Sequence, residues 1–171
     1  MLAKEKPSVF AYHHFVIVLL FILNISISAA AQIASACTLL RPAELESVLG
    51  GKIKSSDENN LGDRSYCNIE INDLKVMVRL ASKKNKNSDA EIKGAEILRK
   101  QGWGVTIKTE GKLTLSTLIP PENLKGAVFT TSASILDNGR VLAVEISAVT
   151  KNKMVSTETA KNLVQKAFSR L

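Results

Sequence analysis

The chain has 171 residues and a formal net charge of +7, from 23 basic and 16 acidic side chains. Its two histidines, His13 and His14, lie in an N-terminal segment with the features of a secretory signal. A mature chain without histidine excludes Ser-His-Asp and Cys-His catalysis and any histidine-ligated metal site.

The N-terminal segment 1–31 is predicted to be a secretory signal peptide. Lys4 and Lys6 precede a 13-residue apolar run over 15–27, and small residues follow up to Ala31. We expect cleavage after Ala31. This leaves a domain over 32–171 with 140 residues, of which 21 are basic and 15 acidic, a net charge of +6. That length suits a single domain that buries a real core.

Two alternatives stay open for this segment. Residues 15–33 are long enough for a retained membrane anchor, although Asn24 and Gln32 dilute the apolar stretch. Cys37 could instead be lipidated after cleavage, although Ala34 stands where such sites usually carry leucine. In all three cases the domain is exported, because the N-terminal lysines favour the cytoplasmic side of the membrane and the rest of the chain then crosses it. The domain is expected to be periplasmic or secreted, or alternatively anchored to a membrane outside the cytoplasm.

The mature chain has two cysteines, Cys37 and Cys67. In an exported protein an even count predicts a disulfide, and with 29 intervening residues it would contribute about 3.5 kcal/mol. The alternative is a redox-active pair, but such pairs are usually close in sequence, as in Cys-X-X-Cys. We therefore predict a structural disulfide that ties the start of the first helix to a strand.

Hydrophobic periodicity and turn residues predict helices at both ends of the domain and hairpins between them. The expected elements are a helix over 42–49, a short strand over 52–56, strands over 66–71 and 74–81, a helix over 88–101, a strand over 105–109, an extended segment over 113–119, strands over 125–136 and 141–149, and a helix from about 156. This order predicts an α+β fold, a two-layer sandwich with a mainly antiparallel β-sheet and helices packed on one face.

The last helix has the cleanest apolar stripe of the chain and is expected to pack on the sheet. The stripe consists of Ala160, Leu163, Val164, Ala167, Phe168 and Leu171. The turns are equally clear, because Asn72-Asp73 and Asn138-Gly139 each separate two alternating strands.

The polar segment 57–64 is predicted to be a solvent-exposed loop. It superficially resembles a calcium-binding loop, but Leu61 occupies a ligand position and Asn68 stands where a bidentate glutamate is needed. We therefore expect no metal ion at this segment, and no motif in the sequence indicates a cofactor.

The segment 37–45, Cys-Thr-Leu-Leu-Arg-Pro-Ala-Glu-Leu, resembles the start of a bacterial family of exported domains of unknown function, often lipoproteins. Members begin Cys-x-Leu-Leu-Thr-Pro-Ala-Glu-Val and carry a second cysteine on an early strand, where Cys67 stands. Residues 126–129, the Asn138-Gly139 hairpin and the closing helix are also similar. The resemblance implies an α/β sandwich similar to the Mog1/PsbP-like fold, without known catalytic residues. Arg41 replaces the usual threonine, so the expected side-chain helix cap is missing.

The leading functional prediction is a non-enzymatic envelope or secreted domain that binds a protein, glycan or small ligand. It rests on the lack of a nucleophile–base pair in the mature sequence. Trp103, between Gly102 and Gly104, is a candidate platform for ligand stacking, or else a core residue at a helix end.

The alternative prediction is a basic protein that adheres to anionic lipid or envelope polymer. Its candidate contacts are Lys83, Lys84 and Lys86, which share one loop. An exported location argues against nucleic acid as the partner. An enzyme such as a hydrolase is least favoured, because the glutamates are scattered over predicted solvent faces.

Overall fold

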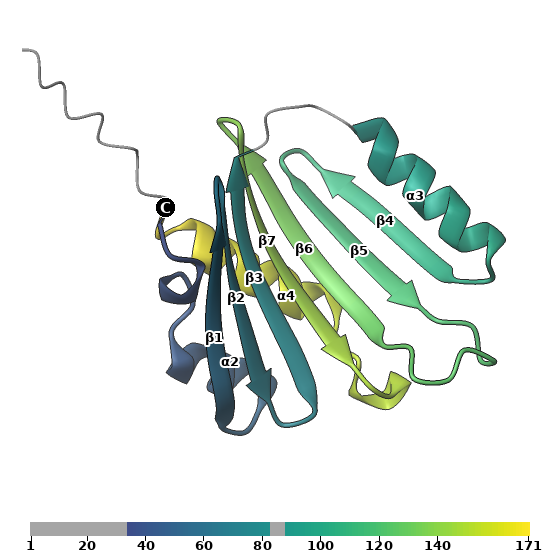
Figure 1. The fold of residues 1–171 in the computed structure, drawn as a ribbon, viewed down its shortest axis with the longest axis horizontal. Coiled ribbons are helices and arrows are strands. Elements are labelled where there is room, and N and C mark those ends of the chain that lie inside the picture. The colour runs from purple at the N-terminus through teal and green to yellow at the C-terminus, as the bar shows by residue number, and fades with distance from the viewer. Residues whose placement is uncertain (1–33, 83–87) are drawn as a thin grey trace, which may run out of the picture. The chain divides into compact units, whose positions relative to one another are not determined.

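The computed structural model describes residues 34–82 and 88–171. Within these residues, seven strands form a single antiparallel sheet in the order β1-β2-β3-β7-β6-β5-β4 (Figure 1). The prediction of an α+β fold with a mainly antiparallel sheet is confirmed. The predicted signal peptide, 1–31, lies outside the described residues.

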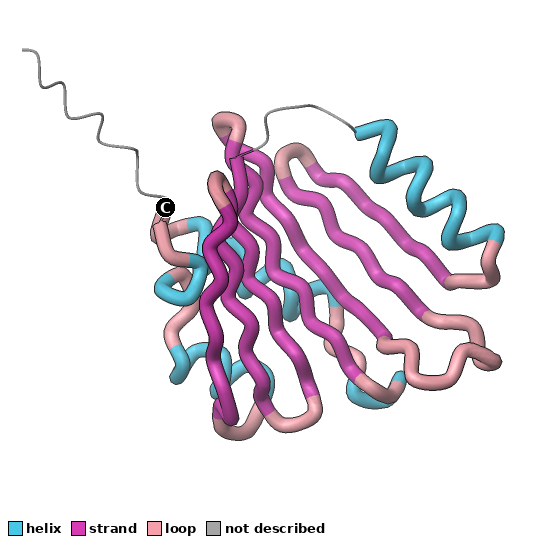
Figure 2. Tube along the Cα trace, in the orientation of Figure 1, coloured by secondary structure: helices cyan, strands magenta, loops and turns pink. Residues whose placement is uncertain are grey.

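Figure 2 shows which segments of the chain are helices, strands and loops. The helices and strands are η1 Ala36–Thr38, α2 Pro42–Leu49, β1 Ile53–Leu61, β2 Arg64–Ile71, β3 Leu74–Ser82, α3 Ser88–Lys100, β4 Gly104–Glu110, β5 Leu113–Ile119, β6 Phe129–Asp137, β7 Arg140–Ala148, η2 Lys151–Lys153 and α4 Thr157–Phe168. The extended segment expected over 113–119 is a full strand. The strand expected from 125 begins only at Phe129, because the N–H of Ala127 donates to the carbonyl of Leu124 in a preceding turn.

The prediction of a loop over 57–64 is wrong. Residues up to Leu61 belong to β1, an edge strand that pairs with β2, and the turn is confined to Gly62 and Asp63. Every residue of β1 after Ile53 is exposed, so the strand has no apolar alternation to reveal it. Its backbone hydrogen bonds to β2 hold the strand extended. Its polar and charged side chains disfavour pairing of this exposed sheet edge with a strand of another molecule.

The helices η1, α2 and α4 lie on one face of the sheet (Figure 1). The alternating residues Cys67, Ile69 and Ile71 of β2 and Leu74, Val76, Val78 and Leu80 of β3 are buried on this face, as predicted. They join side chains of β5, β6, β7 and α4 in one core cluster. Alternation directs the intervening residues of the same strands to the opposite face. We call this opposite side the open face, since none of η1, α2 and α4 covers it. The helix α3 runs alongside β4 at the sheet edge.

The closing helix α4 begins where the sequence predicts. The N–H of Thr159 donates to Oγ of Ser156, which caps the helix. Four residues of the predicted stripe are buried, namely Ala160, Leu163, Val164 and Ala167, and Phe168 packs partly against the core. The helix ends at Phe168, however, so Leu171 falls beyond it and is 41% exposed. Its assignment to the buried stripe is wrong.

The predicted disulfide between Cys37 and Cys67 is present, with 4.9 Å between the Cα atoms. It ties η1, just before α2, to the middle of β2, as expected. A structural disulfide indicates an oxidising compartment outside the cytoplasm. Within residues 34–82 and 88–171, no helix is both long enough and apolar enough to cross a membrane.

Glu44 joins the two ends of the domain. Its Oε2 accepts from the N–H of Arg41 at 3.0 Å and from Nη1 of Arg170 at 2.8 Å, and its Oε1 accepts from Nη2 of Arg170 at 2.5 Å. Arg170 also donates to the carbonyl of Leu39 at 2.6 Å. Glu44 thus supplies a helix cap at the position where Arg41 lacks one. The Arg170 guanidinium, and then the Arg41 N–H, lower the pKa of Glu44 to about 2.

This carboxylate should make the stability of the domain depend on pH. Its pKa of about 2 in the folded state lies below the ordinary value of 4.5, so its stabilisation is complete above about pH 4.5 and is lost as the pH falls toward 2. We expect Glu44→Gln to lower the melting temperature by a few degrees at pH 7 and by less at pH 3, measured by circular dichroism.

Glu122→Gln is the matched control, because Glu122 is exposed and forms no ion pair within the described part of the chain. It should leave the melting temperature at both pH values close to that of the wild type. An equal effect of Glu44→Gln at pH 3 and pH 7 would contradict the role given to Glu44.

Candidate functional site

The open face of the sheet carries a hollow of about 530 Å³ over β3, β7, β6, β5 and β4. Strand register builds it from two adjacent rows of side chains. One row is Met77, Glu145, Ser132, Ser116 and Ile107, and the next is Arg79, Ala143, Ser134, Thr114 and Thr109. The hollow therefore belongs to the sheet itself, whose backbone hydrogen bonds hold these side chains in place.

Small side chains explain why there is space at this point. Most lining residues of the central strands are alanine, serine or threonine, apart from Glu145 on β7 and Leu136 on β6, whereas the longer Met77 and Arg79 on β3 and Ile107 on β4 flank them. Two hydroxyls are already paired across strands, since Oγ of Ser116 and Oγ of Ser132 lie 2.7 Å apart. The floor thus offers both hydroxyl groups and apolar surface to a ligand.

Arg79 and Glu145 are the charged residues of the hollow that lack a partner among the residues that the structure describes. They lie diagonally on neighbouring strands, because Glu145 is opposite Met77, two residues before Arg79. Neither forms a hydrogen bond or ion pair within residues 34–82 and 88–171, and the buried Nε of Arg79 has no acceptor there. By contrast, Lys112 at the rim is paired with Asp137 at 2.5 Å. The Nη groups of Arg79 are not buried, and they also have no acceptor among the described residues, so they are the N–H donors that a ligand in the hollow can reach.

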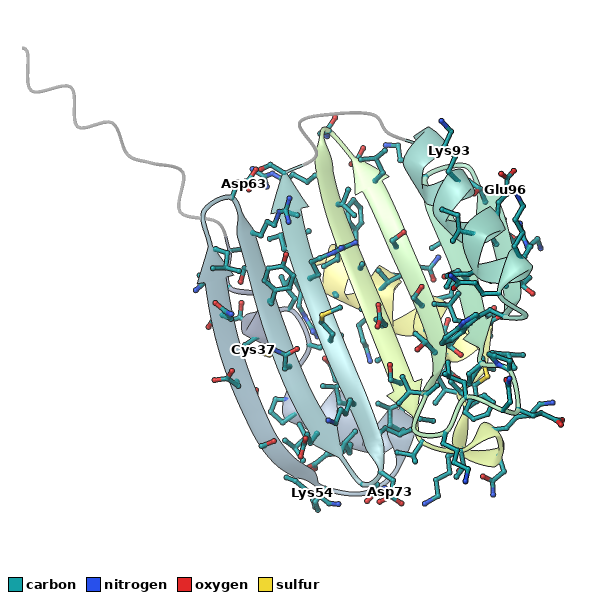
Figure 3. All side chains as sticks on the ribbon, turned by 45° about the vertical axis from the view of Figure 1, so that its right-hand side comes forward. Cys37, Lys54, Asp63, Asp73, Lys93 and Glu96 are labelled. Carbon is teal, nitrogen blue, oxygen red and sulfur yellow. A yellow bond between two sulfur atoms is a disulfide. The ribbon has the colours of Figure 1, made fainter. Side chains whose placement is uncertain are left out.

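A second hollow, of about 260 Å³, lies at the end of the sheet marked by Asp73, opposite the end marked by Asp63 (Figure 3). Its charges are already matched. Asp73 pairs with Lys153, and Lys75 lies 3.9 Å from Glu70. This hollow therefore offers a charged ligand less than the hollow on the open face.

Among the contacts predicted from the sequence, Trp103 is the one that lies within the described residues, and it lines neither hollow. Trp103 is half-buried where α3 passes into β4, and its backbone N–H donates to the carbonyl of Leu98 at 3.0 Å. Figure 3 shows Lys93 and Glu96 on α3, with Glu96 projecting away from the sheet. Lys83, Lys84 and Lys86 lie outside the described residues.

Sequence reasoning missed the pair that the structure brings together. It grouped Glu145 with glutamates scattered on solvent faces and did not single out Arg79. The available signal was alternation, because both residues occupy the polar positions of apolar–polar strands. Alternation shows that each side chain leaves the core, but it does not show that β3 lies beside β7.

The site combines one guanidinium, one carboxylate and several hydroxyls with apolar walls, a combination suited to holding a polar ligand by charge and hydrogen bonds. Within the part of the chain that the structure describes, no group of three or more His, Cys, Asp or Glu side chains could hold a metal ion. The chain matches no protein-family model, and no curated protein sequence matches it either. The resemblance of segment 37–45 to an exported family stays a prediction.

Proposed function

We propose that this protein is a non-enzymatic, extracytoplasmic binding domain whose ligand occupies the hollow on the open face. The observation that carries the proposal is the pair Arg79 and Glu145, two opposite charges that have no partner in the described part of the chain and that line a space of about 530 Å³. Volumes of this size are typical of sites for small ligands. The disulfide and the predicted signal peptide support the extracytoplasmic location.

The chemistry of the hollow favours binding over hydrolysis. A hydrolytic site needs a base that hydrogen-bonds a nucleophile or an attacking water. Glu145 makes no hydrogen bond to the neighbouring hydroxyls in the described structure, and Ser116 and Ser132 bond to each other instead. The hydroxyls therefore serve as ligand contacts in this proposal, and Glu145 serves as a fixed charge.

The test uses the full chain, exported into the periplasm of a bacterial host and purified from it. Amide NMR spectra would be recorded with a panel of glycan fragments, amino acids and short peptides. We expect a ligand to shift amides of β3, β7, β6 and β5 together. Arg79→Ala should raise the Kd of that ligand about 10-fold or more, because it removes charged hydrogen bonds.

Arg140→Ala is the matched control, because Arg140 is exposed at the hairpin between β6 and β7. It should leave the Kd unchanged. Shifts confined to other surfaces, with no effect of Arg79→Ala, would place the binding site elsewhere. Turnover of a bound ligand would contradict the non-enzymatic part of the proposal.

A further inference from the structure

We infer that the ligand in this hollow is a zwitterion of the amino-acid type, whose carboxylate binds Arg79 and whose ammonium group binds Glu145. The inference rests on the proposed function and specifies the chemical class of the ligand. It follows from the charges that the hollow presents and from those that it has already neutralised.

Arg79 is the half of the site that selects an oxyanion. A guanidinium presents its N–H groups as a rigid fork, which matches the two oxygens of a carboxylate. One prong, the Nε–H of Arg79, is buried and has no acceptor among the described residues. A ligand in the hollow cannot reach this buried atom, so its carboxylate would bind the terminal Nη groups of Arg79, which are not buried and form a fork of their own.

Glu145 is the half that rejects a simple anion. Diagonal neighbours on adjacent antiparallel strands have Cα atoms about 7–8 Å apart, within reach of long side chains. A ligand with negative charge alone would bind Arg79 but lie close to the Glu145 carboxylate. A ligand with positive charge alone would be repelled by Arg79. A ligand that carries both charges satisfies both residues.

The remaining charge in the hollow does not disturb this balance. Lys112 at the rim forms an ion pair with Asp137, so Arg79 and Glu145 set the net charge, which is zero. The hydroxyls of Ser132 and Ser134 can bond the polar groups of a peptide unit, and Met77 and Ile107 offer apolar contact to a side chain. A volume of about 530 Å³ suits an amino acid or a dipeptide.

The first experiment compares one ligand with its capped forms on the wild-type protein. The probes are the dipeptide alanyl-alanine with both ends free, its N-acetyl form, its C-terminal amide, and the neutral disaccharide diacetylchitobiose. We expect the free dipeptide to shift open-face amides in a saturable manner. Each capped form should bind at least about 10-fold more weakly, because each cap removes one charged contact.

The second experiment changes the protein conservatively. Arg79→Lys keeps the charge but loses the fork, and Glu145→Gln keeps the shape but loses the charge. Each should raise the Kd of the free dipeptide about 10-fold. Glu145→Gln should not weaken the N-acetyl form, which has no ammonium group. Arg140→Lys and Glu122→Gln, both at exposed positions, are the controls and should change neither Kd.

The outcomes separate this inference from the proposed function. If the capped forms bind as tightly as the free dipeptide, the inference that the ligand is a zwitterion is wrong. If only the disaccharide shifts the open-face amides, the inference of a zwitterionic ligand is wrong, but the proposal that the open face binds a ligand stands. If no probe in either panel affects the open face, both fail. Should a variant not fold, the comparison of capped and free ligands on the wild type decides alone.

Discussion

Replacing both cysteines, in Cys37→Ala/Cys67→Ala, is expected to lower the free energy of unfolding by about 3.5 kcal/mol. The disulfide joins residues with a sequence separation of 30, and in the chain-entropy model its loss frees a loop of that size in the unfolded state. Urea unfolding followed by circular dichroism measures the difference. The reduced unfolded chain is also more expanded, so the slope of free energy against urea concentration should rise.

The wild-type protein treated with a reducing agent is the matched control for this variant. It loses the same cross-link but keeps both sulfur atoms, so it should unfold within about 1 kcal/mol of the double variant. Cys67 is fully buried, and any excess cost of the double variant over the reduced protein measures the packing lost at this position. A double variant as stable as the oxidised wild type would show that the disulfide contributes nothing.

Truncating Leu163 to alanine is expected to cost about 3 kcal/mol of unfolding free energy, because it leaves a cavity in a closely packed core. Leu163 lies on α4, is 1% exposed, and belongs to the cluster that joins this helix to the sheet. Urea unfolding at neutral pH gives the value. The ligand-binding hollow lies on the other face, so a folded Leu163→Ala protein should retain binding.

Leu171→Ala is the control for this prediction, since the sequence assigns both leucines to the same apolar stripe. Leu171 lies past the end of α4 and is 41% exposed, so its truncation should cost no more than about 0.5 kcal/mol. If both variants lost the same unfolding free energy, Leu171 would be buried on the helical stripe, as the sequence pattern predicts, and not exposed beyond the end of α4.

The elements that the sequence predicts well are those with local physical causes. The turn between β6 and β7 needs positive φ angles, and Asn138 and Gly139 adopt them at 46° and 72°. The capping serine and the helical stripe of α4 are also local, since each depends on residues a few positions apart. The cysteine pair could be predicted because two cysteines in an exported chain allow one pairing.

The strand β1 shows why a local reading fails at an edge. Its residues Asp57 to Asn60 have the composition of a turn, and nothing in them requires burial. They are extended because β2 lies alongside and supplies backbone partners along their length. Leu171 fails for the related reason that helical periodicity does not determine where a helix ends.

By itself, the amino-acid sequence determined the helices, most strands, the hairpins and the disulfide, because each depends on neighbouring residues or on a single available pairing. The tertiary structure alone decided that β3 pairs with β7 and that η1, α2 and α4 cover one face and not the other. Such pairings join segments far apart in the chain, and many of them satisfy the same alternation. The candidate site depends on that choice, because Arg79 and Glu145 become neighbours only when these two strands pair.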